Sequence, residues 1–445
     1  MSHLSVKPIP PAGLLLPLCL AMALSLALWF VPGCGLFDGF TRPASNGPAL
    51  TNEIGDETPH DFTPQGPCDV AVTNAGDSGP GSLRQAIADV CDGGRITFAA
   101  DYTIYLNSTL SITKRLAVDG ETHAVAVSGD SGGDGTPNVP VFYIGGVVTL
   151  THLNIVNGAA GDDGNGGGIY NNYLGTLAVQ DSTLSGNSAS EGGGIYNYGW
   201  NTLTVQNSTF SGNQATGTGG GIYNSSTGKM TVQNSTLADN SAGTAGGIHN
   251  GGTLTVQNST LSGNSATSNG GGIYSEDTLT VQNSTLSGNR AGHGGGIYSS
   301  WGALAVRNST FFGNQATAAG GGIYNMNARV HLSNTLIAHT PFGGDCRNVA
   351  GGNIANDHNL MQSTLIAATC GIADGAGGSR IGVDPLLGPL GDYGGTTPTH
   401  ALLPGSPAID GGGSTCLATD QRGTPRPQGA ACDIGAFEMN STPAD

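Results

Sequence analysis

Carboxylates are the first side chains in this sequence to consider for chemistry, because hydrolysis of a glycosidic bond needs two of them, about 5 to 9 Å apart, facing one bond. The central part of the chain carries Asp181, Asp239, Glu276 and Asp277 at unrelated places. None of these acids belongs to a pair that recurs at the same position of neighbouring repeats. The sequence therefore favours solvated loop charges over a hydrolytic site, and it identifies no catalytic residue.

A lyase that acts on an anionic polysaccharide would need a basic groove and, in most cases, calcium. The central bases, Lys229, Arg290, Arg307 and Arg329, are scattered, and the histidines show no metal-ligand spacing. Two acidic stretches, 129–135 and 161–165, combine carboxylates with glycine turns and could hold calcium, although plain turns are favoured because the stretches do not repeat. No cofactor is expected; calcium is the one cation with a candidate site.

Tyrosine is the residue with the most regular placement. Each of six tyrosines follows the isoleucine of a Gly-Gly-Ile phrase, and His249 takes the equivalent place in a seventh copy. Neighbouring residues of a strand point to opposite faces, so the rings should form an outward stripe with one ring per coil. Such a stripe is a candidate binding site for glycans or partner proteins; a stripe that stacks on itself or lies under a loop is the alternative. The stripe consists of Tyr170, Tyr196, Tyr223, Tyr274, Tyr298 and Tyr324.

The elements that position these tyrosines belong to a repeat of 24 to 27 residues, measured between the isoleucines from Ile169 to Ile323. A second phrase, Leu-Thr-Val-Gln-Asn-Ser-Thr-Phe-Ser-Gly-Asn at 203–213, recurs between the Gly-Gly-Ile copies. Its apolar and polar residues alternate, and no segment carries a helical stripe. A period of this length with strand chemistry predicts a solenoid of three short strands per coil.

The fold class expected from this repeat is all-β, a right-handed parallel β-helix with coils of about 25 residues, a small N-terminal helical cap and an irregular C-terminal cap. The right hand follows from connections of variable length between fixed strands. Stacked asparagines should form two amide ladders at the bends. One would contain Asn207, Asn234, Asn258, Asn283 and Asn308, and the other Asn187, Asn213, Asn240, Asn264, Asn289 and Asn314.

The N-terminus carries a targeting segment. Lys7 precedes the eighteen uncharged residues 14–31, and Val31-Pro32-Gly33-Cys34 follows. This order predicts a signal peptide over 1–33. Three fates stay open: attachment of a lipid to Cys34, cleavage and release, or retention as a membrane anchor, for which eighteen residues are just long enough. The protein is therefore expected outside the cell or at its surface, with contact to a membrane only through this anchor.

The remaining chain divides by composition. Residues 34–67 form a polar tether, 68–98 an N-terminal cap, 99–345 the β-helix, 346–438 the C-terminal coils and cap, and 439–445 a tail. In the cap, Ser82 is the expected N-cap of an amphipathic helix that carries Leu83, Ala86 and Ile87. Six cysteines suggest disulfides by nearness alone, with free buried thiols as the alternative. The suggested pairs are Cys68 with Cys91, Cys346 with Cys370, and Cys416 with Cys432.

Several phrases carry a resemblance to known families. Gly-Gly-Ile-Tyr alternating with Asn-Ser-Thr-Phe-Ser-Gly-Asn resembles the repeats of polymorphic outer membrane proteins, and residues 77–87 resemble the N-terminal motif of large bacterial surface β-helix proteins. Residues 403–410, 419–427 and 432–438 are similar to the end of the "choice-of-anchor" β-helix family. The resemblance implies a secreted, surface-attached right-handed β-helix without an assigned reaction.

Charge and composition limit the classes of molecule that the protein is expected to bind. The net charge is −17, and the chain has three lysines, which speaks against nucleic acid as a partner. The expected function is binding or adhesion at a surface, to an extracellular glycan or a cell-surface protein. The alternative is a polysaccharide lyase or glycoside hydrolase, of the pectate lyase kind, on the same fold.

Overall fold

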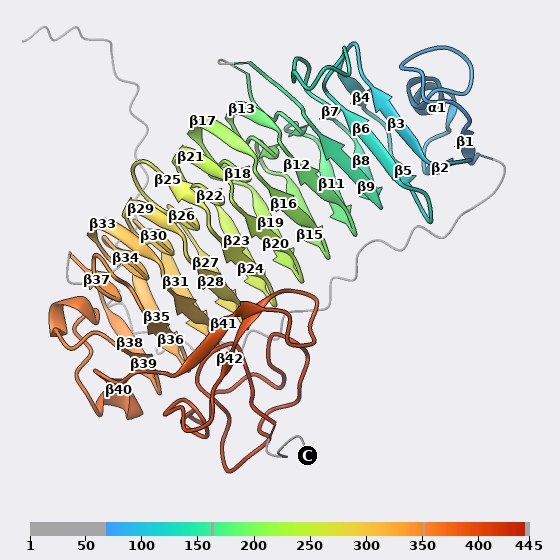
Figure 1. Cartoon of the computed structure of the whole chain (residues 1–445). Helices are drawn as coiled ribbons and strands as arrows, with labels where there is room; N and C mark the ends of the chain where they lie inside the picture. The colour runs from blue at the N-terminus through green and yellow to red at the C-terminus, as the bar shows by residue number, and fades with distance from the viewer. Residues whose placement is uncertain (1–67, 162–163, 350–351, 441–445) are drawn as a thin grey trace, which may run out of the picture. The chain divides into compact units, whose positions relative to one another are not determined.

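The computed structural model describes residues 68–161, 164–349 and 352–440, all within a compact unit from Thr58 to Asp445. The expected signal peptide, the tether and Cys34 lie outside the described residues. The described chain winds into stacked coils whose equivalent strands pair in parallel, so the predicted all-β parallel β-helix is confirmed (Figure 1). No described helix combines the length and the apolar character needed to cross a membrane.

One coil shows the path of the chain. It runs through β11 (Thr176–Gln180), β12 (Thr183–Ser185), β13 (Ser188–Glu191) and β14 (Ile195–Asn197), and each strand belongs to a different parallel sheet, here numbered sheets 1 to 4 in that order. The sequence predicts three strands per coil. The fourth strand, β13, was missed because Ser-Ala-Ser-Glu has little apolar alternation and resembles a connection.

The two longest sheets have twelve strands each. Sheet 1 contains, besides β11, the strands β1 (Val70–Val72), β2 (Gly94–Phe98), β5 (Leu116–Asp119), β8 (Val147–Thr151), β15 (Thr202–Gln206), β19 (Lys229–Gln233), β23 (Thr253–Gln257), β27 (Leu279–Gln282), β31 (Ala303–Arg307), β35 (Arg329–Ser333) and β38 (Ile354–Asp357). Sheet 2 contains, besides β12, the strands β3 (Tyr102–Tyr105), β6 (Val125–Ser128), β9 (Leu153–Val156), β16 (Thr209–Ser211), β20 (Thr236–Ala238), β24 (Thr260–Ser262), β28 (Thr285–Ser287), β32 (Thr310–Phe312), β36 (Leu336–Ala338), β39 (Leu360–Met361) and β40 (Arg380–Ile381).

The two shorter parallel sheets have six and ten strands. Sheet 3 contains β13, β17 (Gln214–Thr218), β21 (Ser241–Thr244), β25 (Ser265–Ala266), β29 (Arg290–His293) and β33 (Gln315–Ala319). Sheet 4 contains β14 together with β4 (Leu110–Ile112), β7 (Phe142–Ile144), β10 (Ile169–Asn171), β18 (Ile222–Asn224), β22 (Ile248–Asn250), β26 (Ile273–Ser275), β30 (Ile297–Ser299), β34 (Ile323–Asn325) and β37 (Cys346–Asn348). The remaining elements are α1 (Leu83–Asp89), the 3-10 turns η1 (Ile366–Ala368) and η2 (Ala376–Gly378), and the antiparallel pair β41 (Leu387–Gly391) and β42 (Thr399–Leu402).

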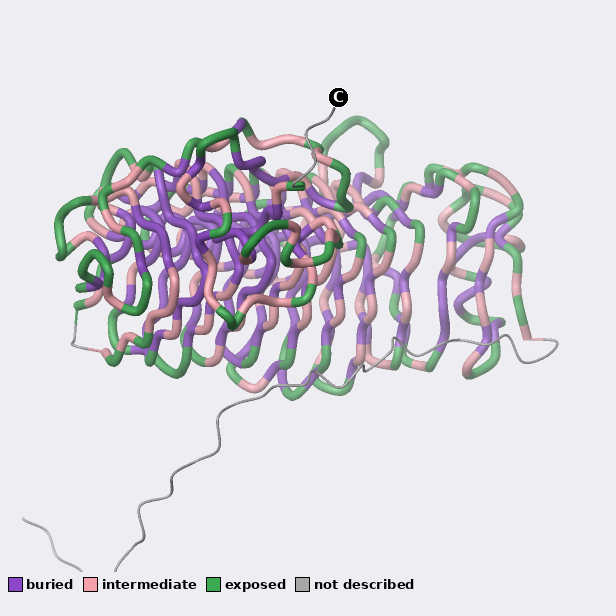
Figure 2. Tube along the Cα trace, turned by 90° about the horizontal axis from the view of Figure 1, so that it is seen from below, coloured by how far each residue is buried: buried purple, intermediate pink, exposed green. Residues whose placement is uncertain are grey.

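The core fills the inside of the coils. In the coil that contains β15, Ile195, Leu203, Val205 and Phe210 are all fully buried, while Thr204 between them faces out. This is the alternation that the sequence shows, and each such side chain contributes about 1.5–3 kcal/mol when buried. Figure 2 shows the coils side by side, with buried stretches alternating with more exposed ones around each coil.

Tight bends connect the strands. Asn207 stands in the left-handed region with φ of 50°, which asparagine tolerates better than most residues. Two glycines before β14 are required for different reasons. Gly192 has a positive φ of 64°. A Cβ on Gly193 would lie 2.3 Å from the Gln214 carbonyl oxygen of the next coil. Only glycine allows this approach of two backbones.

One asparagine ladder is complete and buried. From Asn187 to Asn314, each side-chain amide donates to the amide oxygen of the next coil at 2.9 Å. The other predicted ladder is wrong beyond Asn234: its members share positive φ values, but Asn283 and Asn308 hydrogen-bond to the C-terminal residues instead of to each other. A further ladder, missed by the sequence analysis, links Asn171, Asn197, Asn224 and Asn250.

Helix α1 closes the first coil. The hydroxyl of Ser82 accepts a hydrogen bond from the Gln85 backbone N–H at 3.2 Å, as expected of an N-cap. Leu83 and Ala86 are buried in the same core cluster as Val72 of β1. The helix therefore extends the core of the coils beyond the first strands.

The segment 382–440, here called the C-terminal arm, lies along the side of the coils (Figure 1). Its β41–β42 pair packs on the outer face of sheet 2, where Leu336 and Phe312 meet Leu402 and Phe437 in a second hydrophobic cluster. Polar contacts add to it: Thr285 bonds to Thr399 at 2.9 Å and to Gln421 at 2.7 Å. The irregular C-terminal region thus covers a flank, while coils continue up to β40.

The three suggested disulfides are present: Cys68–Cys91, Cys346–Cys370 and Cys416–Cys432. The first joins the residues on either side of α1, the second joins β37 to the turn after η1, and the third lies within the C-terminal arm.

Candidate functional site

The predicted tyrosine stripe forms a continuous stack of aromatic rings on sheet 4, here called the aromatic column. Neighbouring ring centroids lie 4.7 to 5.6 Å apart. The column contains the six predicted tyrosines, His249 in its middle and Tyr143 at its N-terminal end, and Tyr143 pairs in register with Tyr170. The repeat does not predict Tyr143, which lies outside the Gly-Gly-Ile copies.

The strand register produces the column. Each aromatic residue follows an isoleucine or phenylalanine that points into the core, as in Ile195–Tyr196 paired with Ile222–Tyr223. Parallel strands about 4.8 Å apart hold equivalent rings close to stacking distance. The rings therefore point away from the core and against one another.

The rings are less exposed than an outward stripe would be. Tyr196, Tyr298 and His249 are buried, and the other members are half-buried. Burial raises the pKa of Tyr196 and Tyr223, and it lowers the pKa of the His249 imidazole to about 4. The rings of Tyr196, Tyr223 and His249 are therefore neutral at neutral pH.

Side chains flank the column on both sides. On the sheet 3 side, the His293 ring meets the Tyr324 ring edge-on, with 4.9 Å between the ring centroids. The pKa of Tyr223 is raised mainly by burial and, to a smaller extent, by the nearby Glu191 carboxylate. On the other side, the Tyr198 ring stacks on Tyr196 at 6.0 Å, and Met326 sulfur accepts the Tyr298 hydroxyl at 3.2 Å. The rings therefore stack on one another, and neighbouring side chains partly cover them, while ligand binding by the stripe stays a prediction.

The most exposed aromatic residues lie beside the column, on the turns that lead from sheet 4 to sheet 1, here called the turn edge. Trp200 is 72% exposed and Trp301 59%, while Tyr173 and Tyr198 are close to half exposed. The repeat pattern does not predict these residues, but large rings at turn positions that carry serine or glycine in other coils are a signal for them in the sequence. An exposed tryptophan on a turn is a typical anchor for a ligand.

A trough runs over sheet 3. It has a volume of about 450 Å³ and crosses four coils. Its walls combine the alanines of four coils with polar side chains, among them Ser188, Gln214, Thr216, Ser241 and Thr267. The polar groups donate and accept hydrogen bonds, and no wall residue carries a charge, so the trough suits a neutral ligand with polar and apolar faces better than an ionic one.

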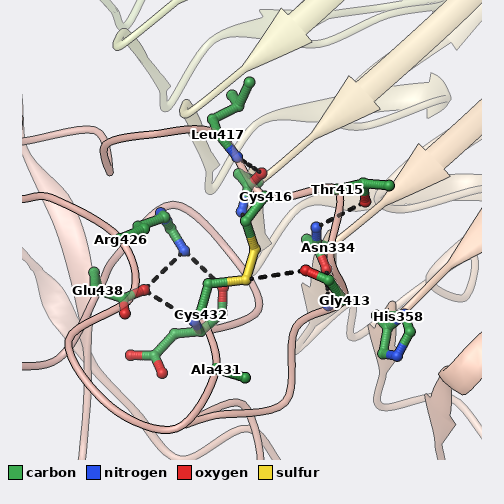
Figure 3. Close-up of a disulfide and its surroundings, with 12 residues drawn as sticks. Asn334, His358, Gly413, Thr415, Cys416, Leu417, Arg426, Ala431, Cys432 and Glu438 are labelled. Atoms are coloured by element: carbon green, nitrogen blue, oxygen red, sulfur yellow. Dashed lines mark hydrogen bonds and ion pairs between the residues drawn. A yellow bond between two sulfur atoms is a disulfide. The ribbon is translucent and has the colours of Figure 1, made fainter.

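The acids and bases of the C-terminal motifs form a buried cluster, here called the clasp, which contains Asp420, Arg422, Arg426, Asp433 and Glu438. Arg426 donates to Glu438 at 3.1 Å beside the Cys416–Cys432 disulfide, and both side chains are buried (Figure 3). The other Glu438 oxygen accepts the Gln428 N–H at 2.8 Å, while Arg422 pairs with Asp420 at 2.7 Å. These carboxylates are saturated by structural partners, so the three motifs build the arm.

The clasp perturbs the titration of its members. Burial raises the pKa of Asp433 to about 6, although backbone N–H groups of Met439 and Asp410 stabilise its carboxylate. Burial also lowers the pKa of Arg426. The shifts follow from burial, and the carboxylates of the cluster are occupied by partners within the arm, so they indicate a structural site rather than a catalytic one.

A second pocket, of about 440 Å³, lies near the last coils. Asp345 is buried in it, and burial raises the pKa of its carboxyl. Both carboxylate oxygens are occupied: one accepts the Thr340 hydroxyl at 2.5 Å and the other the Ser363 N–H at 2.6 Å. His339 lines the same pocket. Asp345 therefore fixes the local loops.

The carboxylates that the sequence offers as candidates for hydrolysis lie on different coils, except for the neighbours Glu276 and Asp277. Asp181 accepts a hydrogen bond from the Asn207 amide at 3.1 Å, and Glu276 lies 3.9 Å from His249. A carboxylate–imidazole pair, Asp119 with His152 at 2.8 Å, occurs near the N-terminal coils. Burial opposes ionisation of Asp119, yet the bonds from His152 and Arg95 leave its pKa lowered. Arg95 pairs with Asp119 at 2.8 Å and with Glu121 at 2.7 Å, so one guanidinium group binds both carboxylates of this cluster.

The two proposed calcium stretches differ in what the structure describes. In the first, the Asp130 carboxylate accepts the backbone N–H groups of Asp134 and Gly135, which closes the turn on itself. In the second, residues 162 and 163 lie outside the described residues. Within the described ranges, no three residues among His, Cys, Asp and Glu are grouped as they would be around a metal ion.

Comparison with known proteins supports the fold. Residues 167–337 match a family model described as "Right handed beta helix region". This range runs from the coil of β10 to the coil of β36, so the hand of the solenoid agrees with the prediction. No curated protein matches the chain.

Proposed function

We propose that this right-handed β-helix is a secreted binding protein that attaches to a surface and holds an extended glycan or a partner protein along its coils. The observation that carries the proposal is the exposure of large aromatic side chains along the turn edge, beside the edges of the aromatic column. Aromatic residues on rigid coils offer contact area at a low cost in conformational entropy. Weak contacts repeated from coil to coil add up by multivalency.

The resemblance of the repeats to polymorphic outer membrane proteins, and of residues 403–438 to the choice-of-anchor family, supports a location at the cell surface. The three disulfides are consistent with an oxidising compartment. Attachment would occur through a lipid on Cys34. A radioactive fatty acid should label the wild type and not Cys34→Ser, and label that persists in the variant would assign the anchor elsewhere.

A glycan array probed with the whole protein tests binding directly. The alternative enzyme is tested in the same samples by assays for reducing sugars and for unsaturated products. Binding without product release supports the proposal. Product release that depends on Asp119 or His152 would instead favour the enzyme, because a paired carboxylate and imidazole can act as an acid–base couple.

A further inference from the structure

Two neighbouring turns, those that follow β10 and β14, bring four large side chains together on the turn edge. Tyr173 and Leu174 follow β10, and Tyr198 and Trp200 follow β14 one coil later. Tyr173 is 49% exposed, Leu174 74%, Tyr198 44% and Trp200 72%. These four residues are here called the turn platform.

A glycine joins the two turns into one surface. Gly199 has φ of 88°, and a Cβ at this position would lie 2.5 Å from Cδ2 of Tyr173. The missing side chain lets the Tyr173 ring lie directly against the turn of the next coil. The platform is therefore a packed surface rather than two independent loops.

Hydrogen bonds hold the second turn rigid. The Asn201 side-chain amide donates to the Tyr198 carbonyl oxygen at 2.7 Å and bridges back to the Asn172 carbonyl of the preceding turn. Ser225 of the following coil accepts the Gly199 N–H and donates to the Gly199 carbonyl, both at 2.9 Å. A surface fixed in this way loses little conformational entropy when a ligand binds.

The chemistry around the platform selects the ligand. The three turns over 171–176, 197–202 and 224–229 consist of asparagine, serine, threonine, glycine and the platform residues, with Lys229 as their one charged side chain. The protein's net charge of −17 opposes the approach of a polyanion. Amides and hydroxyls beside flat aromatic rings match a neutral sugar, whose hydroxyls need hydrogen bonds and whose C–H face needs an apolar surface.

Size argues against a protein as the occupant. A specific protein interface covers about 800 Å² on each partner. Three aromatic side chains that bury about 150–250 Å² each when fully covered, and are already partly covered, offer less than that.

We propose that the turn platform, centred on Trp200 and Tyr173, binds a neutral oligosaccharide of pyranose sugars. This inference rests on the proposed function and gives it a site and a ligand class. Trp301, which is 59% exposed on the same edge more than three coils further on, provides a matched control.

The test uses the full-length chain and two neutral probes, cellohexaose and mannohexaose, with an oligogalacturonate as the acidic probe. Binding is followed by calorimetry and by the tryptophan fluorescence of a Trp29→Phe/Trp301→Phe variant, in which Trp200 is the one remaining tryptophan. We expect Trp200→Ala and Tyr173→Ala each to weaken binding of a neutral probe by about three- to tenfold, the loss of one stacked ring. Trp301→Ala should bind like the wild type, and thermal melting should show that all variants are folded.

Other outcomes overturn the inference in distinguishable ways. An equal loss in Trp301→Ala would mean that binding is spread along the edge. Unchanged affinity in Trp200→Ala and Tyr173→Ala, while the wild type binds glycans on the array, would remove the platform and leave the proposed function standing. A preference for oligogalacturonate that disappears in Lys229→Gln would replace the neutral ligand by an acidic one. A wild type that binds no glycan refutes the inference, and the proposed function then depends on a protein partner.

Discussion

The imidazole ring of His249 lies 4.7 Å from the phenol ring of Tyr223, with 9° between the two planes. Tyr274 covers the opposite face at 5.2 Å, and Nδ1 of His249 is buried without a hydrogen-bond partner in the described part of the chain. Burial accordingly lowers the pKa of His249 to about 4. The aromatic column therefore contains a built-in acid-sensitive position.

This position gives the first prediction. The unfolded chain has a histidine pKa of about 6.5, so between pH 6.5 and 4 protons bind the unfolded state in preference. Stability that is present above pH 6.5 is lost as the pH falls towards 4. His249→Tyr should remove this loss and raise the free energy of unfolding by roughly 2 kcal/mol at pH 5, and by much less at pH 8. Urea unfolding at both pH values measures the difference. An equal change at pH 5 and pH 8 would contradict the assignment.

The buried ladder gives the second prediction. Asn289 accepts from both the backbone and the side chain of Asn264 and donates to Asn314 and to the Leu261 carbonyl. Asn289→Leu leaves these groups without partners, at about 1 to 3 kcal/mol for each unsatisfied group. The midpoint of guanidinium unfolding should fall clearly.

Asn207→Gly is the matched control, because Asn207 is exposed and glycine keeps its positive φ. Its effect should stay within a few tenths of a kcal/mol. Equal effects of the two variants would show that the buried ladder contributes nothing beyond the backbone turn.

The clasp gives the third prediction. Glu438→Gln removes the one carboxylate that pairs directly with the buried Arg426 guanidinium in the described part of the chain, which should destabilise the arm by about 3 to 5 kcal/mol. Limited proteolysis should then cut within 382–440 while the coils resist. Asp92→Asn removes the exposed pair with Arg115 and should cost at most about 1 kcal/mol. A Glu438→Gln arm as resistant as the wild type would mean that the clasp does not hold it.

The fourth prediction concerns the column itself. Changing Tyr223, Tyr274 and Tyr298 together to serine should lower stability, because each stacked pair contributes about 0.5–1.5 kcal/mol beyond its buried area. The same triple change to phenylalanine keeps the rings and should stay close to the wild type in thermal melting. If the serine variant melts at the same temperature as the wild type, the ring stacking contributes nothing to stability. The tyrosines would then have no structural role, and ligand binding would be the remaining role for them.

The sequence predicts the coils well because their information is local. The alternation around Leu203 and Val205 and the turn chemistry at Asn207 both act within a few residues, and the suggested disulfides join residues close in sequence. The C-terminal arm could not be placed in this way, since Gln421 and Thr260 are 161 residues apart. A signal existed: Phe312 and Leu336 put large apolar side chains on an outer face that carries serine or threonine in other coils.

In the candidate site, too, local features are predicted from the sequence and contacts between coils are not. The repeat places one aromatic residue per coil correctly, but the depth to which Tyr196 and Tyr298 are buried depends on Tyr198 and Met326 from neighbouring turns. The turn platform depends on a contact between Tyr173 and Gly199 that only the stacking of two coils creates. Whether the stripe or the platform binds a ligand stays a prediction.

The arm has a consequence for how such a chain can grow. It contacts five successive coils, through Thr260, Asn283, Asn308, Asn334 and Asp357 among others, so it fixes both their number and their order. Duplication of a whole coil upstream of Asn258 would lengthen the solenoid and leave every arm contact in place. A coil inserted between Asn283 and Asn308 would instead move the contacts on one side of it by about 4.8 Å. Variation in length among descendants of such a gene would therefore accumulate on the N-terminal side, while the five coils under the arm are inherited as a block.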